Sequence, residues 1–196
     1  MHKTIYQEFE KICSKANITG SVLEVGAVPS PQSLLCMKAL RNVKEKIGLN
    51  LDEPREYKDI KIVRGNANSM DCFEDEKFDA VLCNAVLEHD KFFWKSISEI
   101  KRVTKSGGLI VIGVPGYTTL KLEEIKKLNF IKKLRAIECL NMFFTSTITH
   151  QVHFGPGDYY RFSIQAVEEV LFDGLADVEI KTLMLPPRII GKGIKK

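Results

Sequence analysis

Five short apolar runs in this chain end next to small, polar or acidic residues that could bind a ligand. Carboxylate and amide oxygens accept hydrogen bonds from sugars and bases, and histidine can move a proton. The residues at these ends are Glu24 to Ala27 for the first run, Asp52 after the second, Gly65 to Ala67 after the third, Asn84 to His89 after the fourth, and Pro115 to Tyr117 after the fifth.

The turn after the first run discriminates between ligand types. Dinucleotide sites use a G-x-G-x-x-G turn whose backbone N–H groups hold a pyrophosphate. The turn here, GAVPSP, has only Gly26, and Pro29 and Pro31 each lack an N–H donor. It therefore suits a nucleoside without phosphates and disfavours a nicotinamide enzyme. Asp52 could accept two ribose hydroxyls. Glu24 could bind the ammonium group of a ligand, or it could be a structural ion-pair partner. Because burying a charge at the end of a strand is costly without a purpose, we favour the ligand-binding role.

The elements that must position these residues follow from apolar periodicity. The five runs predict strands at Val22–Val25, Ile47–Leu51, Ile60–Val63, Phe78–Asn84 and Leu109–Val114. Helices are predicted from Thr4 to before Asn17, over Gln32–Val43, and from a cap at Asp90 to Gly107–Gly108. Alternating strands and helices imply a parallel sheet, which binds ligands beyond the carboxyl ends of its strands where the strand order reverses.

The alternation lapses after the fifth strand. We expect a lid insertion at about 117–157, with a basic helical stretch at Lys121–Leu140. Its lysines predict a solvated face, or less favourably a surface for an anionic partner. Ser163 should then cap a helix, Asp177–Leu185 should form an edge strand, and PPRIIGKGIKK should trail off as a basic tail. Residues 1–196 are predicted to be a single domain.

Composition excludes several classes of protein. With 44% hydrophobic and 28% charged residues the chain is neither disordered nor fibrous. The net charge of +4 gives no strong nucleic-acid signal, and we expect neither a membrane span nor a signal peptide. Five scattered cysteines without a CxxC motif indicate buried thiols and a cytoplasmic location. No metal site is expected, and the sequence does not indicate an oligomeric state.

Taken together, these segments resemble the class I S-adenosylmethionine-dependent methyltransferases, in particular their type 11 branch. VLEVGA is similar to the first motif, FDAVLCNAVLEH to the fourth-strand segment, and EIKRVTKSGGLIVIGVPG to the helix, turn and strand that follow. DYYRFS is similar to an aromatic–arginine segment over the active site. The chain departs from the family in its single glycine, in Asn66 at a commonly acidic position, and in the lack of an evident seventh strand.

The resemblance implies a Rossmann-like α/β fold: a doubly wound, mostly parallel sheet with helices on both faces and the lid after the fifth strand. It implies S-adenosyl-L-methionine as cofactor. The cofactor-binding residues it implies are Glu24, Gly26, Ala27, Asp52, Asn66, Ala67 and Asn84. The reaction would be methyl transfer to a small-molecule or glycan-type acceptor at oxygen, in which the enzyme aligns the reactants and supplies a base.

Candidate residues for the acceptor side carry alternative interpretations. The catalytic candidates are His89, His153 and Asp158, and the substrate-binding candidates are His150, Tyr159, Tyr160 and Arg161. His89 could instead hydrogen-bond the backbone, and the other two histidines could be solvated. The tyrosines could be lid core, and Arg161 could pair with Asp158 or Glu88. The rival hypothesis for the whole chain is a catalytically silent module of the same fold that binds a partner through its basic lid.

Overall fold

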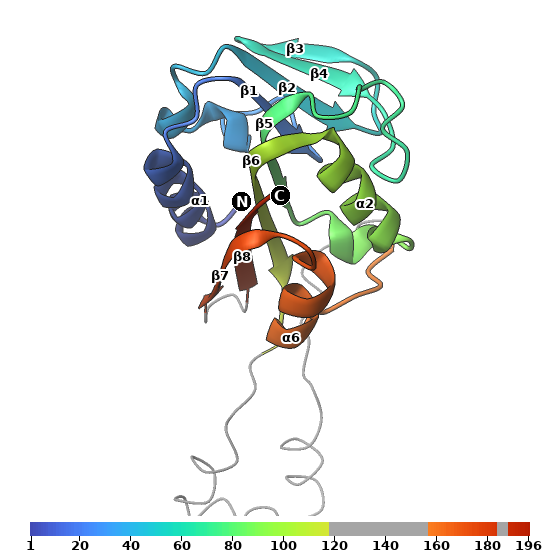
Figure 1. Ribbon diagram of the computed structural model, residues 1–196. Helices are drawn as coiled ribbons and strands as arrows, with labels where there is room; N and C mark the ends of the chain where they lie inside the picture. The colour runs from blue at the N-terminus through green and yellow to red at the C-terminus, as the bar shows by residue number, and fades with distance from the viewer. Residues whose placement is uncertain (118–156, 184–187) are drawn as a thin grey trace, which may run out of the picture.

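The computed structural model describes residues 1–117, 157–183 and 188–196, and these residues form one eight-stranded sheet (Figure 1). The strands are β1 Ser21–Val25, β2 Glu45–Asn50, β3 Arg55–Tyr57, β4 Ile60–Arg64, β5 Phe78–Asn84, β6 Thr104–Pro115, β7 Ala176–Leu183 and β8 Arg188–Ile194. The expected insertion at 117–157, with its basic helix, lies almost entirely outside the described residues.

The strand order is β3-β4-β2-β1-β5-β6-β8-β7. From β4 to β6 neighbouring strands run parallel, whereas β3 is antiparallel to β4 and β8 is antiparallel to both β6 and β7. The chain leaves β1 toward β2 on one side and reaches β5 on the other. The order therefore reverses at β1, and a crevice is expected beyond the carboxyl ends of β1 and β5.

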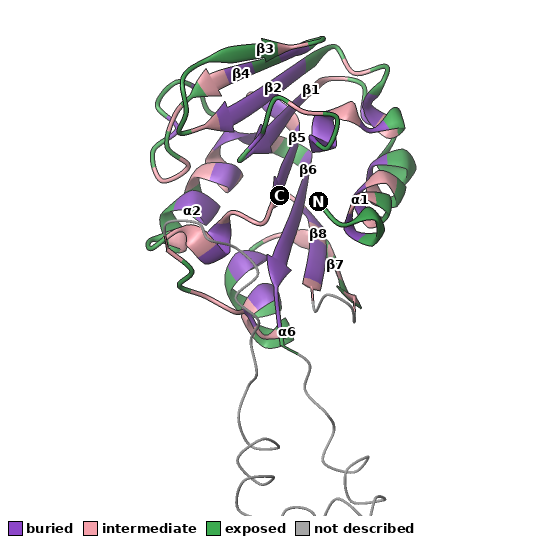
Figure 2. Ribbon diagram, turned by 180° about the vertical axis from the view of Figure 1, so that it is seen from behind, coloured by how far each residue is buried: buried purple, intermediate pink, exposed green. Residues whose placement is uncertain are grey.

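The two long helices cover opposite faces of the sheet (Figure 1). Helix α1, Lys3–Ala16, packs Ile5, Phe9 and Cys13 into the core on one face. Helix α2, Phe93–Val103, packs Ile97 and Ile100 into the core on the other. The strands between them are buried on both sides (Figure 2), which is why they appear in the sequence as continuous apolar runs.

The doubly wound α/β architecture and the five parallel strands expected from the sequence are confirmed. The boundaries differ most at β2, which runs from Glu45 to Asn50, and at β6, which already begins at Thr104, directly after α2. The expected cap at Ser163 is present, since its Oγ accepts from Ala166 N at 2.9 Å. Ser163 caps the short helix α6, Ile164–Ala166, which continues into the π-helical turn η4, Val167–Leu171.

The helix expected over Gln32–Val43 is wrong. The structure has two single 3-10 turns there, η1 Leu34–Cys36 and η2 Lys38–Leu40, with Met37 extended between them. Tertiary contacts take over the backbone N–H groups that a helix would use. The carboxylate of Glu10 on α1 accepts from the N–H groups of Lys38 and Ala39 at 3.1 and 2.7 Å.

The expectation of a basic tail after residue 185 is also wrong, because β8 occupies this position and is the antiparallel strand thought to be missing. It lies between β6 and β7 and buries Ile189 and Ile190. Its glycines are packing requirements. A Cβ on Gly191 would lie 2.4 Å from the Phe172 ring, so the position requires glycine. Because glycine and lysine are not typical of strands, the segment resembles a tail in the sequence.

Candidate functional site

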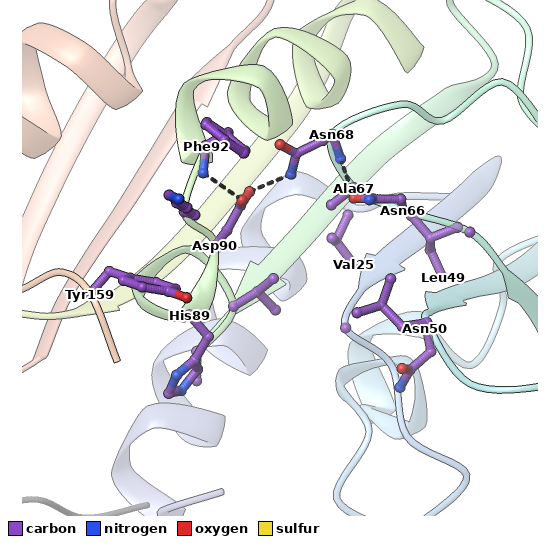
Figure 3. A pocket seen from close by; sticks show the side chains of 16 residues that line it. Val25, Leu49, Asn50, Asn66, Ala67, Asn68, His89, Asp90, Phe92 and Tyr159 are labelled. Atoms are coloured by element: carbon purple, nitrogen blue, oxygen red, sulfur yellow. Dashed lines mark hydrogen bonds between the residues drawn. The ribbon is translucent and has the colours of Figure 1, made fainter. Parts of the chain in front are cut away.

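A cavity of about 450 Å³ opens beyond the carboxyl ends of β1, β2, β4 and β5, at the reversal of strand order (Figure 3). Its size is within the roughly 300–1,000 Å³ of small-molecule sites. The lining residues are Val25, Gly26, Leu49, Asn50, Leu51, Gly65, Asn66, Ala67, Asn68, Ala85, Val86, His89, Asp90, Lys91, Phe92 and Tyr159.

Asn50 is the polar residue at the end of β2. Its Nδ2 donates to the carbonyl oxygen of Ala27 at 2.6 Å, which fixes the amide beside the first turn. Leu51, 68% exposed, follows it at the cavity edge. Asp52 lies two residues beyond the strand end, is exposed, and does not line the cavity.

A hydrogen-bond network joins the loop after β4 to the start of α2. Asn66 Oδ1 accepts from Asn68 N at 2.9 Å, and Asn68 Nδ2 donates to Asp90 Oδ2 at 2.7 Å (Figure 3). Asp90 also accepts from Ser96 Oγ at 2.6 Å and from Phe92 N at 2.8 Å. The cavity wall formed by these residues is therefore held by side chains as well as by the sheet.

His89 lies in the 3-10 turn η3, Leu87–His89, and its side chain is fixed by the backbone. Its Nδ1 is 2.6 Å from the carbonyl oxygen of Gly157. Because a carbonyl only accepts, Nδ1 carries the proton, and in a neutral ring the lone pair is on Nε2. Tyr159 N donates to the carbonyl oxygen of Glu88 at 2.8 Å, so residues 157–159 lie against η3.

Glu24 does not line the cavity. Its side chain is buried on the α1 side of the sheet, where it accepts from Ser33 Oγ, from Leu34 N at 3.1 Å and from Leu35 N at 3.4 Å. Burial raises the pKa of Glu24, and these three hydrogen bonds act against that rise. The carboxylate thus stabilises the segment after the first turn.

The first turn offers few backbone donors to a ligand. Gly26 N and Ala27 N both donate to the carbonyl oxygen of Leu49, at 2.8 and 3.2 Å. Together with the two prolines this leaves a poor anion cradle, as the sequence indicated. Ala27 is fully buried, and Gly26 lines the cavity.

The remaining sequence candidates divide by position. Arg161 pairs with Asp158, with Nη2 2.6 Å from Oδ2, and this contact raises the pKa of Arg161. Tyr160 packs against the core and donates its hydroxyl to Lys91 O at 2.9 Å. Asn84 ends β5 outside the cavity lining, and its Oδ1 is buried without a hydrogen-bond partner among the described residues.

His150 and His153 lie outside the described residues. Within 1–117, 157–183 and 188–196, no group of three or more His, Cys, Asp or Glu side chains could hold a metal ion. No helix in that part of the chain is long and apolar enough to cross a membrane.

Seven lining residues were not candidates for ligand binding in the sequence: Leu49, Asn50, Leu51, Asn68, Asp90, Lys91 and Phe92. Asn50 could have been found by ending the second strand one residue earlier. Asp90 was predicted only as a helix cap. The others carry no local signal, because their position depends on how the loops after β4 and β5 fold over the sheet.

Comparison with known proteins is consistent with this geometry. Residues 25–112 match the model of a family described as a methyltransferase domain. Over 73 residues the chain is 38% identical to the uncharacterized protein MJ1123 of Methanocaldococcus jannaschii, a match that covers 35% of each protein. The matched segment therefore spans about a third of that relative.

Solved structures match nearly the whole chain at low sequence identity. The 1,6-didemethyltoxoflavin-N1-methyltransferase of Burkholderia thailandensis, with S-adenosylhomocysteine bound, has a TM-score of 0.66 at 14% identity, covering 97% of this chain and 78% of that one. The protein PH0226 of Pyrococcus horikoshii has 0.65 at 15%, covering 99% and 91%. A putative methyltransferase of Bacillus halodurans has 0.60 at 15%, covering 96% and 99%.

The sheet order, the cavity at the strand reversal and the solved structures define a Rossmann-like methyltransferase fold. The family match covers the segment from the end of β1 into β6, which supplies most of the cavity wall. The chain therefore has the fold of the class I S-adenosylmethionine-dependent methyltransferases, and its residues 25–112 match the methyltransferase-domain family.

Proposed function

We propose that this chain transfers a methyl group from S-adenosylmethionine to a hydroxyl oxygen of a small-molecule or glycan-type acceptor. The observation that carries the proposal is the cavity at the strand reversal, which brings Asn50, Asn66 and His89 into one lining. The fold class supports S-adenosylmethionine as the methyl donor, and His89, which can accept a proton, supports a hydroxyl oxygen as the acceptor atom.

The donor set of the cavity fits the cofactor. Asn50 Oδ1 can accept from a ribose hydroxyl, as a neutral counterpart of the acidic residue expected at this strand end. Leu51, Ala67 and Val86 offer apolar surface for an adenine ring, and the Asn66 amide is suited to its polar edge. The N–H groups of the first turn are already bonded to Leu49 O, which suits a ligand without a pyrophosphate.

The chemistry divides between cofactor and chain. When bound, S-adenosylmethionine supplies an activated methyl group that needs no further electrophile. The chain holds the acceptor in line and excludes water, and alignment of this kind can lower a barrier by roughly 7–11 kcal/mol. His89, oriented by Gly157 O, would receive the hydroxyl proton at Nε2 when the acceptor oxygen takes the methyl group and the thioether S-adenosylhomocysteine leaves.

Calorimetry with S-adenosylhomocysteine tests the proposal directly. We expect saturable binding, no binding of NAD, and methylation of a hydroxyl acceptor that depends on His89. The silent-module hypothesis was based on the depleted glycine turn and on a missing last strand, and β8 removes the second reason. No heat with S-adenosylhomocysteine and no thermal shift would favour that silent module.

A further inference from the structure

Three large aromatic side chains stand exposed on one side of the cavity. Phe92, Trp94 and Tyr159 are 43%, 50% and 54% exposed. Phe92 and Tyr159 line the cavity and lie on the side opposite Leu49 and Asn50 (Figure 3). We name these three residues the aromatic rim. Clustered exposed rings of this kind mark interaction surfaces.

The aromatic rim packs on further rings, of which Phe162 is buried and Phe93 and Tyr160 are half-buried. Phe93 makes edge-to-face contacts with Trp94, Tyr160 and Phe162 at centroid distances of 5.5, 4.9 and 5.3 Å. Phe92 contacts Trp94 in the same manner at 5.7 Å. Since the rings are ordered before any ligand arrives, a flat ligand would lose less free energy in ordering them.

The charge beside the aromatic rim is positive. Lys91 and Lys95 place Nζ 5.6 and 5.3 Å from the centroid of the Phe92 ring. The carboxylate nearby, Asp90, already accepts hydrogen bonds from Phe92 N, Asn68 and Ser96. Within the part of the chain that the structure describes, Lys91 and Lys95 face a group bound at the rim. The carboxylate of Asp90 is already hydrogen-bonded, and that of Asp158, which precedes Tyr159, is paired with Arg161.

This charge decides between two kinds of aromatic ligand site. Rings without nearby lysines can hold a methylammonium or other cation against their faces. Here Lys91 and Lys95 already provide the cations over Phe92, and they repel a further one. We infer that the aromatic rim binds the acceptor, and that the acceptor is a planar aromatic molecule carrying a carboxylate. The inference rests on the proposed function, because it assumes that methyl donor and acceptor share this cavity.

The chain contains a single tryptophan, Trp94, so its fluorescence reports on the aromatic rim alone. Benzoate, benzyl alcohol and benzylamine carry the same ring with negative, zero and positive charge, and cyclohexanecarboxylate carries the negative charge without a planar ring. We expect benzoate to quench Trp94 at about tenfold lower concentration than benzylamine, since an exposed lysine contributes about three- to fivefold. Cyclohexanecarboxylate should bind more weakly than benzoate.

Variants separate the role of charge from that of the ring. Replacing both Lys91→Gln and Lys95→Gln should bring benzoate and benzylamine to within about threefold of each other. Lys58→Gln is the matched control, because Lys58 lies 5.3 Å over the Tyr57 ring at the opposite end of β4 and should leave the preference unchanged. Phe92→Leu should weaken benzoate but not cyclohexanecarboxylate.

Each contrary result overturns a defined part of the inference. Equal or tighter binding of benzylamine would overturn the anionic acceptor, and equal binding of cyclohexanecarboxylate would overturn ring stacking. No quenching by any of the four probes would overturn the site. All titrations are run with and without S-adenosylhomocysteine, whose own binding is measured by calorimetry. If S-adenosylhomocysteine alone fails to bind, the proposed function is overturned, and the relative affinities of the four probes still test the aromatic rim.

Discussion

Gly26 lines the cavity with a backbone conformation that favours glycine, and its replacement gives the sharpest test of the local packing. Its φ is +81°, and a Cβ there would lie 2.4 Å from Cγ2 of Val86. Gly107 has nearly the same φ, +78°, with nothing within 4 Å of its Cβ position. Comparing Gly26→Ala with Gly107→Ala therefore separates backbone strain from side-chain collision.

The expected magnitudes follow from these two contributions. A left-handed backbone costs an alanine about 1–2 kcal/mol at either position. Overpacking against Val86 adds about 1–3 kcal/mol at Gly26 alone. At roughly 2–4 °C per kcal/mol for a domain of this size, Gly26→Ala should melt about 2–12 °C below Gly107→Ala. Val86→Ala, introduced into Gly26→Ala, should recover most of that difference.

Thermal and urea unfolding of the parent protein, Gly26→Ala, Val86→Ala and the double variant gives a double-mutant cycle, and Gly107→Ala is measured beside it. We expect a coupling energy of about 1–3 kcal/mol between Gly26 and Val86. If the two glycine variants melt at the same temperature, or if Val86→Ala restores no stability to Gly26→Ala, then the first turn does not contact Val86 as described, and the cavity lining at these two residues is wrong.

Three further predictions concern the cavity and its support. Asn50→Ala should weaken S-adenosylhomocysteine binding about tenfold in calorimetry, whereas Asp52→Ala should change it less than twofold; the reverse order would move the ribose to the loop after β2. His89→Gln should slow methyl transfer to a hydroxyl acceptor roughly 10²- to 10⁴-fold in a radiolabel assay without changing S-adenosylhomocysteine affinity, and an unchanged rate would exclude His89 as the base. The hydrogen bond from Arg102 holds the pKa of Glu99 below its ordinary 4.5, so its contribution is complete above that pH and is lost as the pH falls through the folded-state pKa. Glu99→Gln should therefore melt lower than the parent at pH 7, and this difference should shrink as the pH is lowered below 4.5. A difference that stays constant with pH would show that this ion pair does not contribute.

The strands of the sheet could be predicted where a strand is buried on both faces, because its residues then form a continuous apolar run. Phe78–Asn84 is apolar because β5 has a core on each face, and its predicted bounds equal the observed ones. Gly191 and Gly193 in β8 give no such pattern, because their small size is required by Phe172 and Leu175, which come from elsewhere in the chain. The apolar pattern of a sequence indicates which side chains are buried. It does not indicate where a neighbouring side chain leaves room only for glycine.

The cavity could be predicted in position but only partly in its residues. Gly26, Asn66, Ala67 and His89 line it, as expected for residues beyond strand ends, and so does Tyr159, which was expected from the resemblance of its segment. Asp52 and Glu24 do not, for different reasons. A strand that stops one residue earlier than predicted moves the polar position at its end to Asn50, and alternation along β1 turns the Glu24 side chain to the opposite face.

The position of β8 has a consequence for how the sheet opens. Among the described residues β7 has hydrogen-bonded pairing only with β8, while β8 also pairs with β6. Release of β8 would therefore remove the edge strand's only ladder in the same event, so the two should detach as one cooperative unit. Native-state hydrogen exchange would then give the amides of both strands a common opening free energy, below that of the parallel centre.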